Sequence, residues 1–324
     1  MSANPPLLVA DQLTKYFPLP GGRKIHAVDQ VSLTIHEKEV VGLVGESGSG
    51  KSTLGKTLIG LHPRTSGTAT YRGQPLPQRY RPEDFRYWAP KTQMIFQDPY
   101  SSLNPRMTVG EIVGEGLQLH TKLSAAEIRD RAGDWLKRVG LEPDHMSRYP
   151  HEFSGGQRQR IGIARALILE PEFVVCDEPI SALDVSVQAQ VVNLLDELKT
   201  SMGLTLLFIA HDLSMVRYVS DRMAVMYLGV IVEIGPASDV FFNPKHPYTE
   251  ILVASNPEPD PASERNRRSA TVTGEIPSPV DVPPGCRFQG RCPKVMDVCR
   301  HETPRLKPVS EDPGRQVACH LYGS

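Results

Sequence analysis

The sequence predicts an α/β domain with a mainly parallel β-sheet, followed by a loop-rich C-terminal extension that contains cysteines. Short apolar runs alternate with segments of helical length, a pattern typical of parallel sheets covered by helices. A glycine-rich turn joins one buried run to a helix-compatible segment. Four of the five cysteines lie in the last 39 residues and 11 of the 29 prolines in the last 69, so the composition changes toward the C-terminus.

The strands and helices of the predicted domain follow in order along the chain. Val31–Ile35 alternates apolar and polar residues, as a half-buried strand does, whereas Val40–Val44 is almost continuously apolar, as a buried parallel strand is. The further expected strands are Met94–Phe96, Phe173–Cys176 and Leu206–Ala210. The expected helices are Thr53–Leu61, Ala126–Val139, Arg158–Leu169 and Val187–Thr200.

The overall composition is that of an ordinary globular protein. The 324 residues carry 36 basic and 37 acidic side chains, which argues against a polybasic chain that binds nucleic acid or a membrane surface. No apolar run approaches the ~20 residues that a bilayer span requires. Met1–Pro6 lacks the pattern of an export signal, so we expect a cytosolic chain with reduced cysteines.

The glycine-rich turn carries a phosphate-binding motif. Residues 45–52 read Gly-Glu-Ser-Gly-Ser-Gly-Lys-Ser and match G-x-x-x-x-G-K-[ST] between a buried strand and a helix, which predicts a P-loop NTPase. Backbone N–H groups of such a loop curl around a phosphate, and the helix directs its positive end at the same anion. A turn that only joins strand and helix is the disfavoured alternative. The expected nucleotide ligands are Gly45, Ser47, Gly48, Ser49, Gly50, Lys51, Ser52 and Thr53.

Metal and water ligands are predicted from the same motif and from the strand at Phe173–Cys176. Lys51 is expected to reach the β- and γ-phosphates of ATP, and Ser52 to ligate Mg²⁺. Two acids end the strand, and successive strand residues point to opposite sides. We expect Asp177 to hold Mg²⁺ through its water shell and Glu178 to polarise the attacking water. An acidic pair alone is more often a solvated strand end, but the upstream phosphate loop favours catalysis.

A further motif, Ser154-Gly155-Gly156-Gln157, begins a predicted helix. Ser154 is a suitable N-cap, and the two glycines leave the first amides open to an anion. An ordinary capped helix is the alternative.

Together these motifs resemble the nucleotide-binding subunit of an ATP-binding-cassette (ABC) transporter, over about residues 8–250. Ser154–Gln157 matches the family signature, and the other motifs appear in family order. They are Gln97 for the Q-loop, Asp184 in the D-loop Ser181–Asp184, His211 for the switch histidine, and Phe17, or alternatively Tyr16, for an aromatic residue that stacks on adenine.

The resemblance implies a RecA-like fold with an inserted helical subdomain at about residues 99–157, and ATP hydrolysis by a pair of cassettes. Gln97 would contact Mg²⁺ and the attacking water, and His211 the γ-phosphate. Residues 154–157 and Asp184 would complete the ATP site of a second cassette. Two cassettes would then close around two ATP molecules and reopen after hydrolysis.

Within this family, the chain is most similar to the ATPase subunits of bacterial dipeptide and oligopeptide importers, a group that also handles nickel and other small solutes. Residues 96–105, 181–190 and 246–249 carry this similarity, together with residues 274–279 and 283–286 of the tail. The resemblance implies a second ATPase subunit, typically a paralogue, two membrane permeases, an extracytoplasmic solute-binding protein, and a place on the cytoplasmic face of the inner membrane.

Several functions remain open from the residues alone. The transported solute is not encoded in these motifs, so nickel or another small solute is an alternative to peptides. A soluble ABC ATPase without a transport function typically has paired cassettes or a coiled-coil insertion, which this sequence lacks. A non-catalytic scaffold would have a degraded Glu178, His211 or signature, and all of these are intact.

The tail is predicted to be a separate extension at residues 256–324, joined to an ATPase domain at residues 1–255 by a linker at Pro257–Arg268. Its cysteines lack the paired C-x2-C spacing of structural zinc sites. Four thiolates suit an iron–sulfur cluster or Zn²⁺. The family resemblance favours a [4Fe-4S] cluster, with Zn²⁺ or four unligated thiols as alternatives. The expected ligands are Cys286, Cys292, Cys299 and Cys319, whereas Cys176 belongs to a buried strand.

Overall fold

The computed structural model of the chain describes residues 4–255, 277–310 and 312–322. The chain divides into two compact units, the first formed mainly by residues 80–208 and the second by residues 5–79 and 209–324. The predicted linker at Pro257–Arg268 lies outside the described residues. The domain boundary near residue 255 and the helical subdomain at about residues 99–157 stay predictions.

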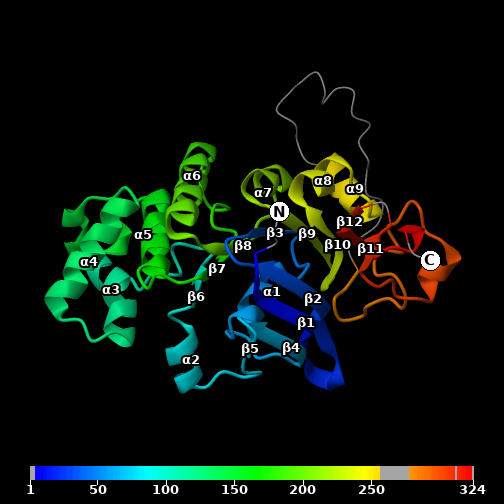
Figure 1. The fold of residues 1–324 in the computed structure, drawn as a ribbon, viewed down its shortest axis with the longest axis horizontal. Helices are drawn as coiled ribbons and strands as arrows, with labels where there is room; N and C mark the ends of the chain where they lie inside the picture. The colour runs from blue at the N-terminus through cyan, green and yellow to red at the C-terminus, as the bar shows by residue number, and fades with distance from the viewer. Residues whose placement is uncertain (1–3, 256–276, 311, 323–324) are drawn as a thin grey trace. The chain divides into compact units, whose positions relative to one another are not determined.

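The second unit contains two sets of strands (Figure 1). Four strands form an antiparallel sheet in the order β2-β1-β4-β5: β1 (Pro6–Pro18), β2 (Lys24–His36), β4 (Ser66–Tyr71) and β5 (Gln74–Pro75). Five more lie in the order β11-β12-β10-β9-β3: β3 (Val40–Val44), β9 (Arg222–Tyr227), β10 (Val230–Pro236), β11 (Lys307–Val309) and β12 (Asp312–Val317). β3 pairs with β9 in parallel, and the other pairs are antiparallel.

The helices of the second unit are short, and the one that matters most for the site is α1. It begins directly after the loop that leaves β3, a strand whose five residues are all buried. The helices are α1 (Lys51–Leu58), α7 (Leu213–Val219), α8 (Ala237–Phe242) and α9 (Pro247–Ala254). Single 3₁₀ turns lie at Pro20–Gly22, Asp297–Arg300 and His320–Tyr322.

The first unit combines three strands with a group of helices (Figure 1). The strands lie in the order β8-β7-β6, with β6 (Thr92–Ile95), β7 (Phe173–Asp177) and β8 (Thr205–Ile209). The helices are α2 (Pro82–Trp88), α3 (Val109–His120), α4 (Ala125–Arg138), α5 (Gly155–Leu167) and α6 (Val185–Met202), with 3₁₀ turns at Pro143–Ser147 and Pro150–Glu152. α3 packs on both α4 and α5, and buries Ile112, Val113 and Leu117.

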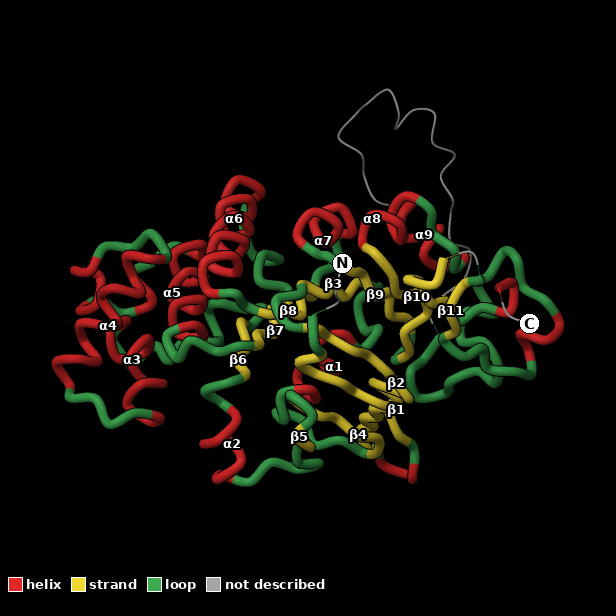
Figure 2. The backbone as a smooth tube through the Cα atoms, viewed as in Figure 1, coloured by secondary structure: helices red, strands yellow, loops and turns green. Residues whose placement is uncertain are grey.

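The predicted buried strands and helices are present, each within three residues at each end, and the predicted Val31–Ile35 lies inside the longer β2. The sequence does not predict β9, β10 or α3. β3 coincides with the predicted Val40–Val44, and α4 is displaced by one residue. The extension is mostly loop, as Figure 2 shows, but it contributes β11 and β12, which the sequence does not predict. No helix in the described ranges has both the length and the apolar composition needed to cross a bilayer.

Candidate functional site

The loop between β3 and α1 has a backbone that only glycine can follow at two positions. Gly45 and Gly50 have φ of 151° and 106°. A Cβ on Gly45 would lie 2.1 Å from the Met226 carbonyl oxygen, and one on Gly50 would lie 2.0 Å from the Ala27 carbonyl oxygen. The loop is therefore pressed against β9 and β2, and its glycines are needed for the close approach.

Lys51 lies across this loop, where a phosphate group would fit. Its Nζ donates to the carbonyl oxygens of Gly45 and Glu46 over 2.8 and 3.0 Å, and the residue is 4% exposed. The hydroxyl of Ser49 is buried and has no hydrogen-bond partner among the described residues. A buried cation next to an unsatisfied donor, at the start of a helix, is chemically suited to a nucleotide phosphate. Ser52 and Thr53 follow in the first turn of α1, and Ser47 and Gly48 are exposed.

Gln97 and Glu178 meet at the carboxyl ends of two neighbouring parallel strands. β6 pairs with β7 so that Ile95 lies opposite Cys176, and Gln97 and Glu178 each follow two residues later. The Gln97 Nε2 donates a hydrogen bond to the Glu178 Oε2 over 2.7 Å. The sequence predicts a contact with the attacking water for each of these two residues from separate motifs. The structure brings the two side chains together. Asp177, the last residue of β7, is 2% exposed.

Glu178 also has an unusual backbone. Its φ of 44° lies in the left-handed region, which a glutamate rarely adopts. A non-glycine residue held in this region costs of order 1–3 kcal/mol, and such residues cluster at functional sites. Six other non-glycine residues of the described ranges, among them Glu170, also have a positive φ, so this backbone sets the direction of the Glu178 side chain but does not by itself identify the catalytic acid.

The signature residues form the capped first turn of α5. The Ser154 hydroxyl accepts a hydrogen bond from the Gln157 N–H, and the Gln157 side chain accepts one from the Ser154 N–H, over 3.3 and 3.0 Å. A Cβ on Gly156 would lie 2.5 Å from Val187 Cγ1, so α5 and α6 approach closely there. Gly155 is half-buried and Ser154 is exposed. This turn presents polar groups to the surface, as a site for a second molecule requires.

The remaining predicted residues take no part in the hydrogen bonds described above. His211 follows β8 and is exposed, and Asp184 precedes α6 without a capping hydrogen bond from its side chain. Phe17 meets the ring of His62 edge-on, with centroids 5.4 Å apart. Tyr16 is the alternative residue for stacking on adenine. Its hydroxyl donates a hydrogen bond to Asp29 over 2.6 Å, which fixes the position of its ring. The functional roles of these residues stay predictions.

The prediction of a [4Fe-4S] cluster at Cys286, Cys292, Cys299 and Cys319 is wrong. All four residues are described, and the described ranges contain no group of three or more His, Cys, Asp or Glu side chains placed to hold a metal ion. The same finding leaves the Zn²⁺ alternative without support. The physical reason is placement, because the side chains are not gathered as a shared metal ion requires. Partial burial in addition raises the pKa of the Cys286 thiol to about 11 and also raises those of Cys292 and Cys319. Protonated thiols are poor metal ligands.

Sequence reasoning missed two residues that contact Glu46 of the phosphate loop, Arg291 and Tyr248. The Glu46 carboxylate accepts hydrogen bonds from both terminal nitrogens of Arg291, and the Glu46 N–H donates to the Tyr248 hydroxyl. Arg291 lies 245 positions from Glu46, inside a tail that was singled out for its cysteines. No motif or spacing links the two residues, so nothing in the sequence pattern could have found this pair.

Comparison with known proteins agrees with this geometry. The family model described as ABC transporter matches residues 28–181, and the one described as Oligopeptide/dipeptide transporter, C-terminal region, matches residues 232–299. A dimeric ATP-binding cassette, solved in a post-hydrolysis state with ADP and Pi, superposes with a TM-score of 0.66 at 30% identity, over 71% of this chain and 99% of that one.

Two curated relatives match nearly the whole chain. YkfD of Bacillus subtilis, provisionally named an oligopeptide transport ATP-binding protein, is 55% identical over 98% of this chain and 96% of its own length. The oligopeptide transport ATP-binding protein OppF of Salmonella typhimurium is 52% identical over 88% of this chain and 85% of its own. These matches confirm the resemblance carried by the motifs. The chain therefore belongs to the ABC transporter ATPases, in the family of the oligopeptide transport ATP-binding proteins.

Proposed function

We propose that this chain is the ATP-hydrolysing subunit of a bacterial importer of di- and oligopeptides, acting on the cytoplasmic face of the inner membrane. The observation that carries the proposal is the pair of matches along one chain. An ABC transporter region is followed by a C-terminal region described for oligopeptide and dipeptide transporters. Two relatives are 55% and 52% identical in sequence over 98% and 88% of this chain, and their names assign them to oligopeptide transport.

The residues around the phosphate loop have distinct roles in this proposal. On ATP binding, Lys51 exchanges its hydrogen bonds to the loop carbonyls for phosphate oxygens, and the Ser49 hydroxyl gains a partner. Ser52 and Asp177 would hold Mg²⁺, which neutralises phosphate charge when it is bound. His211 would contact the γ-phosphate. An exposed position after β8 leaves the His211 imidazole accessible to a ligand.

Glu178 would accept a proton from the attacking water. Its carboxylate is already oriented by the hydrogen bond from Gln97, and the left-handed backbone fixes the direction in which the side chain leaves the strand end. A general base contributes typically 10²–10⁴-fold to a rate when it is held within hydrogen-bond reach of the proton. Gln97 would therefore act both on the water and on the position of the base.

The importer would need a second cassette, two permeases and an extracytoplasmic solute-binding protein. The exposed signature turn and Asp184 support the second cassette, because these polar groups are left open at the surface. Val185, next to Asp184, has the most exposed large apolar side chain of the described residues, at 82%. A partner that covers this segment would remove that apolar surface from water.

Reconstitution of the complete complex in vesicles tests the proposal. The full chain would be co-purified with its membrane subunits and supplied with ATP inside the vesicles and the solute-binding protein outside. We expect uptake of labelled di- and oligopeptides that requires ATP. Uptake of nickel ions but not peptides, or co-purification with ribosomes in place of hydrophobic subunits, would contradict the proposal.

A further inference from the structure

Arg291 of the C-terminal extension reaches Glu46 of the phosphate loop. Arg291 donates from Nη1 and Nη2 to the two carboxylate oxygens of Glu46, over 2.8 and 2.9 Å. The Arg291 side chain is only 6% exposed and that of Glu46 is 24% exposed. The planar guanidinium matches a carboxylate in this two-bonded geometry, so the pair fixes the direction of both side chains.

The backbone of Glu46 is held as well. Its N–H donates to the hydroxyl of Tyr248 over 2.9 Å, and its carbonyl oxygen accepts from Lys51 Nζ over 3.0 Å. Tyr248 lies in the first turn of α9 and is 1% exposed. Glu46 therefore connects the extension, α9 and the phosphate-binding lysine through its own three polar groups. A displacement of Glu46 would move the carbonyl on which Lys51 is positioned.

A buried aromatic cluster lies under the ion pair. Tyr227, Tyr248 and Phe288 are each 1% exposed, and their ring centroids lie 4.6 to 5.4 Å apart. The Arg291 guanidinium lies 5.8 Å from the Tyr227 ring and 5.9 Å from the Phe288 ring. Phe288 belongs to the extension, whereas Tyr227 ends β9. The ion pair thus rests on packed side chains from separate segments, which limits its freedom to move.

The charge of Glu46 makes the contact important for nucleotide binding. An acid in a phosphate-binding loop repels the phosphates of ATP unless a cation compensates it, and the repulsion is stronger in a partly buried site than in water. Arg291 supplies that cation. Its hydrogen bonds to Glu46 raise the pKa of Arg291 above the ordinary value, so the side chain stays charged at every physiological pH.

We propose that Arg291 is a positioning residue of the ATP site. Through Glu46 it holds the phosphate loop in its binding geometry and neutralises the acid that the loop carries. Nucleotide affinity then depends on the docking of the C-terminal extension. The inference rests on the ATP site alone, so it does not depend on whether the importer carries peptides.

Isothermal titration calorimetry of the full chain with ATP tests this role. EDTA is present to remove Mg²⁺, so that ATP binds without being hydrolysed. Arg291→Ala removes the two hydrogen bonds and leaves the Glu46 charge uncompensated, so we expect the Kd for ATP to rise by about tenfold or more. Arg291→Lys keeps the charge but loses the forked geometry, and its Kd should fall between those of the wild type and Arg291→Ala. An unchanged Kd for Arg291→Ala would overturn the proposal.

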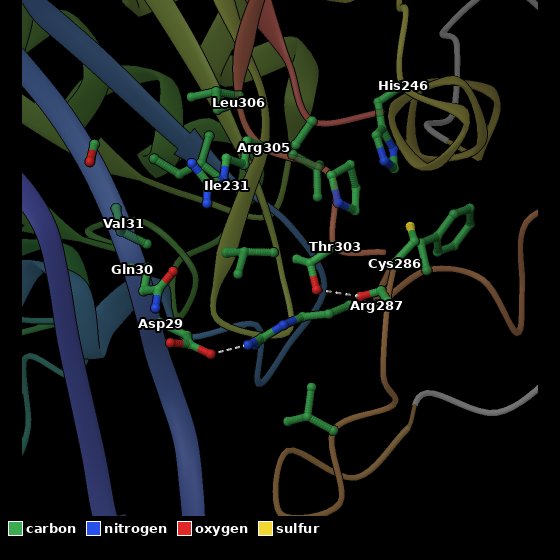
Figure 3. A pocket seen from close by; sticks show the side chains of 18 of the residues that line it. Asp29, Gln30, Val31, Ile231, His246, Cys286, Arg287, Thr303, Arg305 and Leu306 are labelled. Carbon is green, nitrogen blue, oxygen red and sulfur yellow. Dashed lines mark hydrogen bonds and ion pairs between the residues drawn. The ribbon is translucent and has the colours of Figure 1, made fainter. Parts of the chain in front are cut away.

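Arg287→Ala is the matched control for a loosened extension. Arg287 is another buried arginine of the extension, and Figure 3 shows it directed at Asp29 beside a cavity of about 600 Å³. It pairs with Asp29 of β2, which also accepts a hydrogen bond from Tyr16, and it donates to the Leu228 carbonyl oxygen, so this variant loosens the extension without touching Glu46. We expect this variant to keep the Kd for ATP within about twofold of the wild type. A change of that size is smaller than the loss of one charge-assisted hydrogen bond would cause. A loss equal to that of Arg291→Ala would overturn the specific role of Arg291.

The double variant Glu46→Gln with Arg291→Ala separates the charge from simple disruption. Removing the uncompensated carboxylate should lower the Kd for ATP again by about threefold or more relative to Arg291→Ala, since the repulsion is gone. A structural defect in the extension would not be repaired by a change in the loop, so the absence of any recovery counts against the proposal. Thermal unfolding without nucleotide identifies any variant that fails to fold.

Discussion

Glu178 combines three features at the scale of a single residue. It follows a fully buried strand, its backbone lies at φ 44°, and its carboxylate accepts a hydrogen bond from Gln97. The first feature is visible in the sequence, and the other two are not. A strained backbone persists only where the surrounding structure enforces it, so the direction of the carboxylate is set by β7 and by Gln97 together.

Glu178→Gln is expected to bind ATP like the wild type and to lose nearly all turnover. The amide keeps the size of the side chain but cannot accept a proton from water, so kcat should fall by about 10²-fold or more. Phosphate release and ATP binding, measured on the same preparation, check the two halves of this prediction. Glu197→Gln, which replaces an exposed acid of α6, is the matched control. Wild-type phosphate release by Glu178→Gln would refute the role assigned to this residue.

At the scale of elements, the extension is joined to the rest of the second unit by basic side chains that meet acids. The ion pairs are Arg287–Asp29, Arg291–Glu46, Lys294–Glu250 and Arg315–Glu233. The last is the most buried, with side chains 2% and 0% exposed, and Arg315 also donates to the Asn243 carbonyl oxygen. Arg315 lies on β12 and Glu233 on β10, so this pair joins the two strands at the point where they hydrogen-bond.

Arg315→Ala should therefore destabilise the chain strongly. It leaves the Glu233 carboxylate buried without its cation, and breaking a buried pair in this way costs about 3–5 kcal/mol of unfolding free energy. Urea unfolding of the full chain measures the change. Lys294→Ala, which breaks an exposed pair of the same extension, should cost at most about 1 kcal/mol. Equal decreases in unfolding free energy for the two variants would show that the Arg315–Glu233 pair stabilises the chain no more than an exposed ion pair does.

The elements differ in how far the sequence predicts them, and the differences have physical causes. β3, β7 and the helices α4 to α6 follow from apolar patterns and motifs, because each is long or fully buried. β12 contains Pro313 and Gly314, which disfavour strands, and it forms only because β10 and β11 offer partners on both sides. The Gln97–Glu178 contact could be expected, since neighbouring parallel strands end at one edge. The cysteine site could not be judged from spacing, because spacing does not show whether the side chains lie close enough to share a metal ion.

The stability of the whole molecule should depend on pH through the partly buried thiols of the extension. Burial raises the pKa of Cys286 from 9.0 to about 11, and it raises those of Cys292 and Cys319. The folded chain therefore holds these protons more tightly than the unfolded chain does. The resulting contribution is fully present below the unfolded pKa and is lost as the pH rises through the folded pKa. Buried tyrosines such as Tyr227 and Tyr248 act in the same direction at higher pH.

Cys286→Ser isolates one thiol in this alkaline loss, because the serine hydroxyl does not titrate in the range and the tyrosines remain. Thermal unfolding midpoints would be compared from about pH 8 to about pH 11 with reductant present, a range that includes the interval between the unfolded and folded pKa values. We expect the midpoint of the wild type to fall more steeply than that of the variant between pH 9 and pH 11, the two values that bound the Cys286 shift. Below about pH 9 the Cys286 thiol of the wild type is protonated in both the folded and the unfolded chain, and the variant has no such thiol. The two curves should therefore run parallel there. Parallel curves across the whole range would mean that Cys286 ionises as easily in the folded chain as in the unfolded one, and that burial does not keep this thiol protonated.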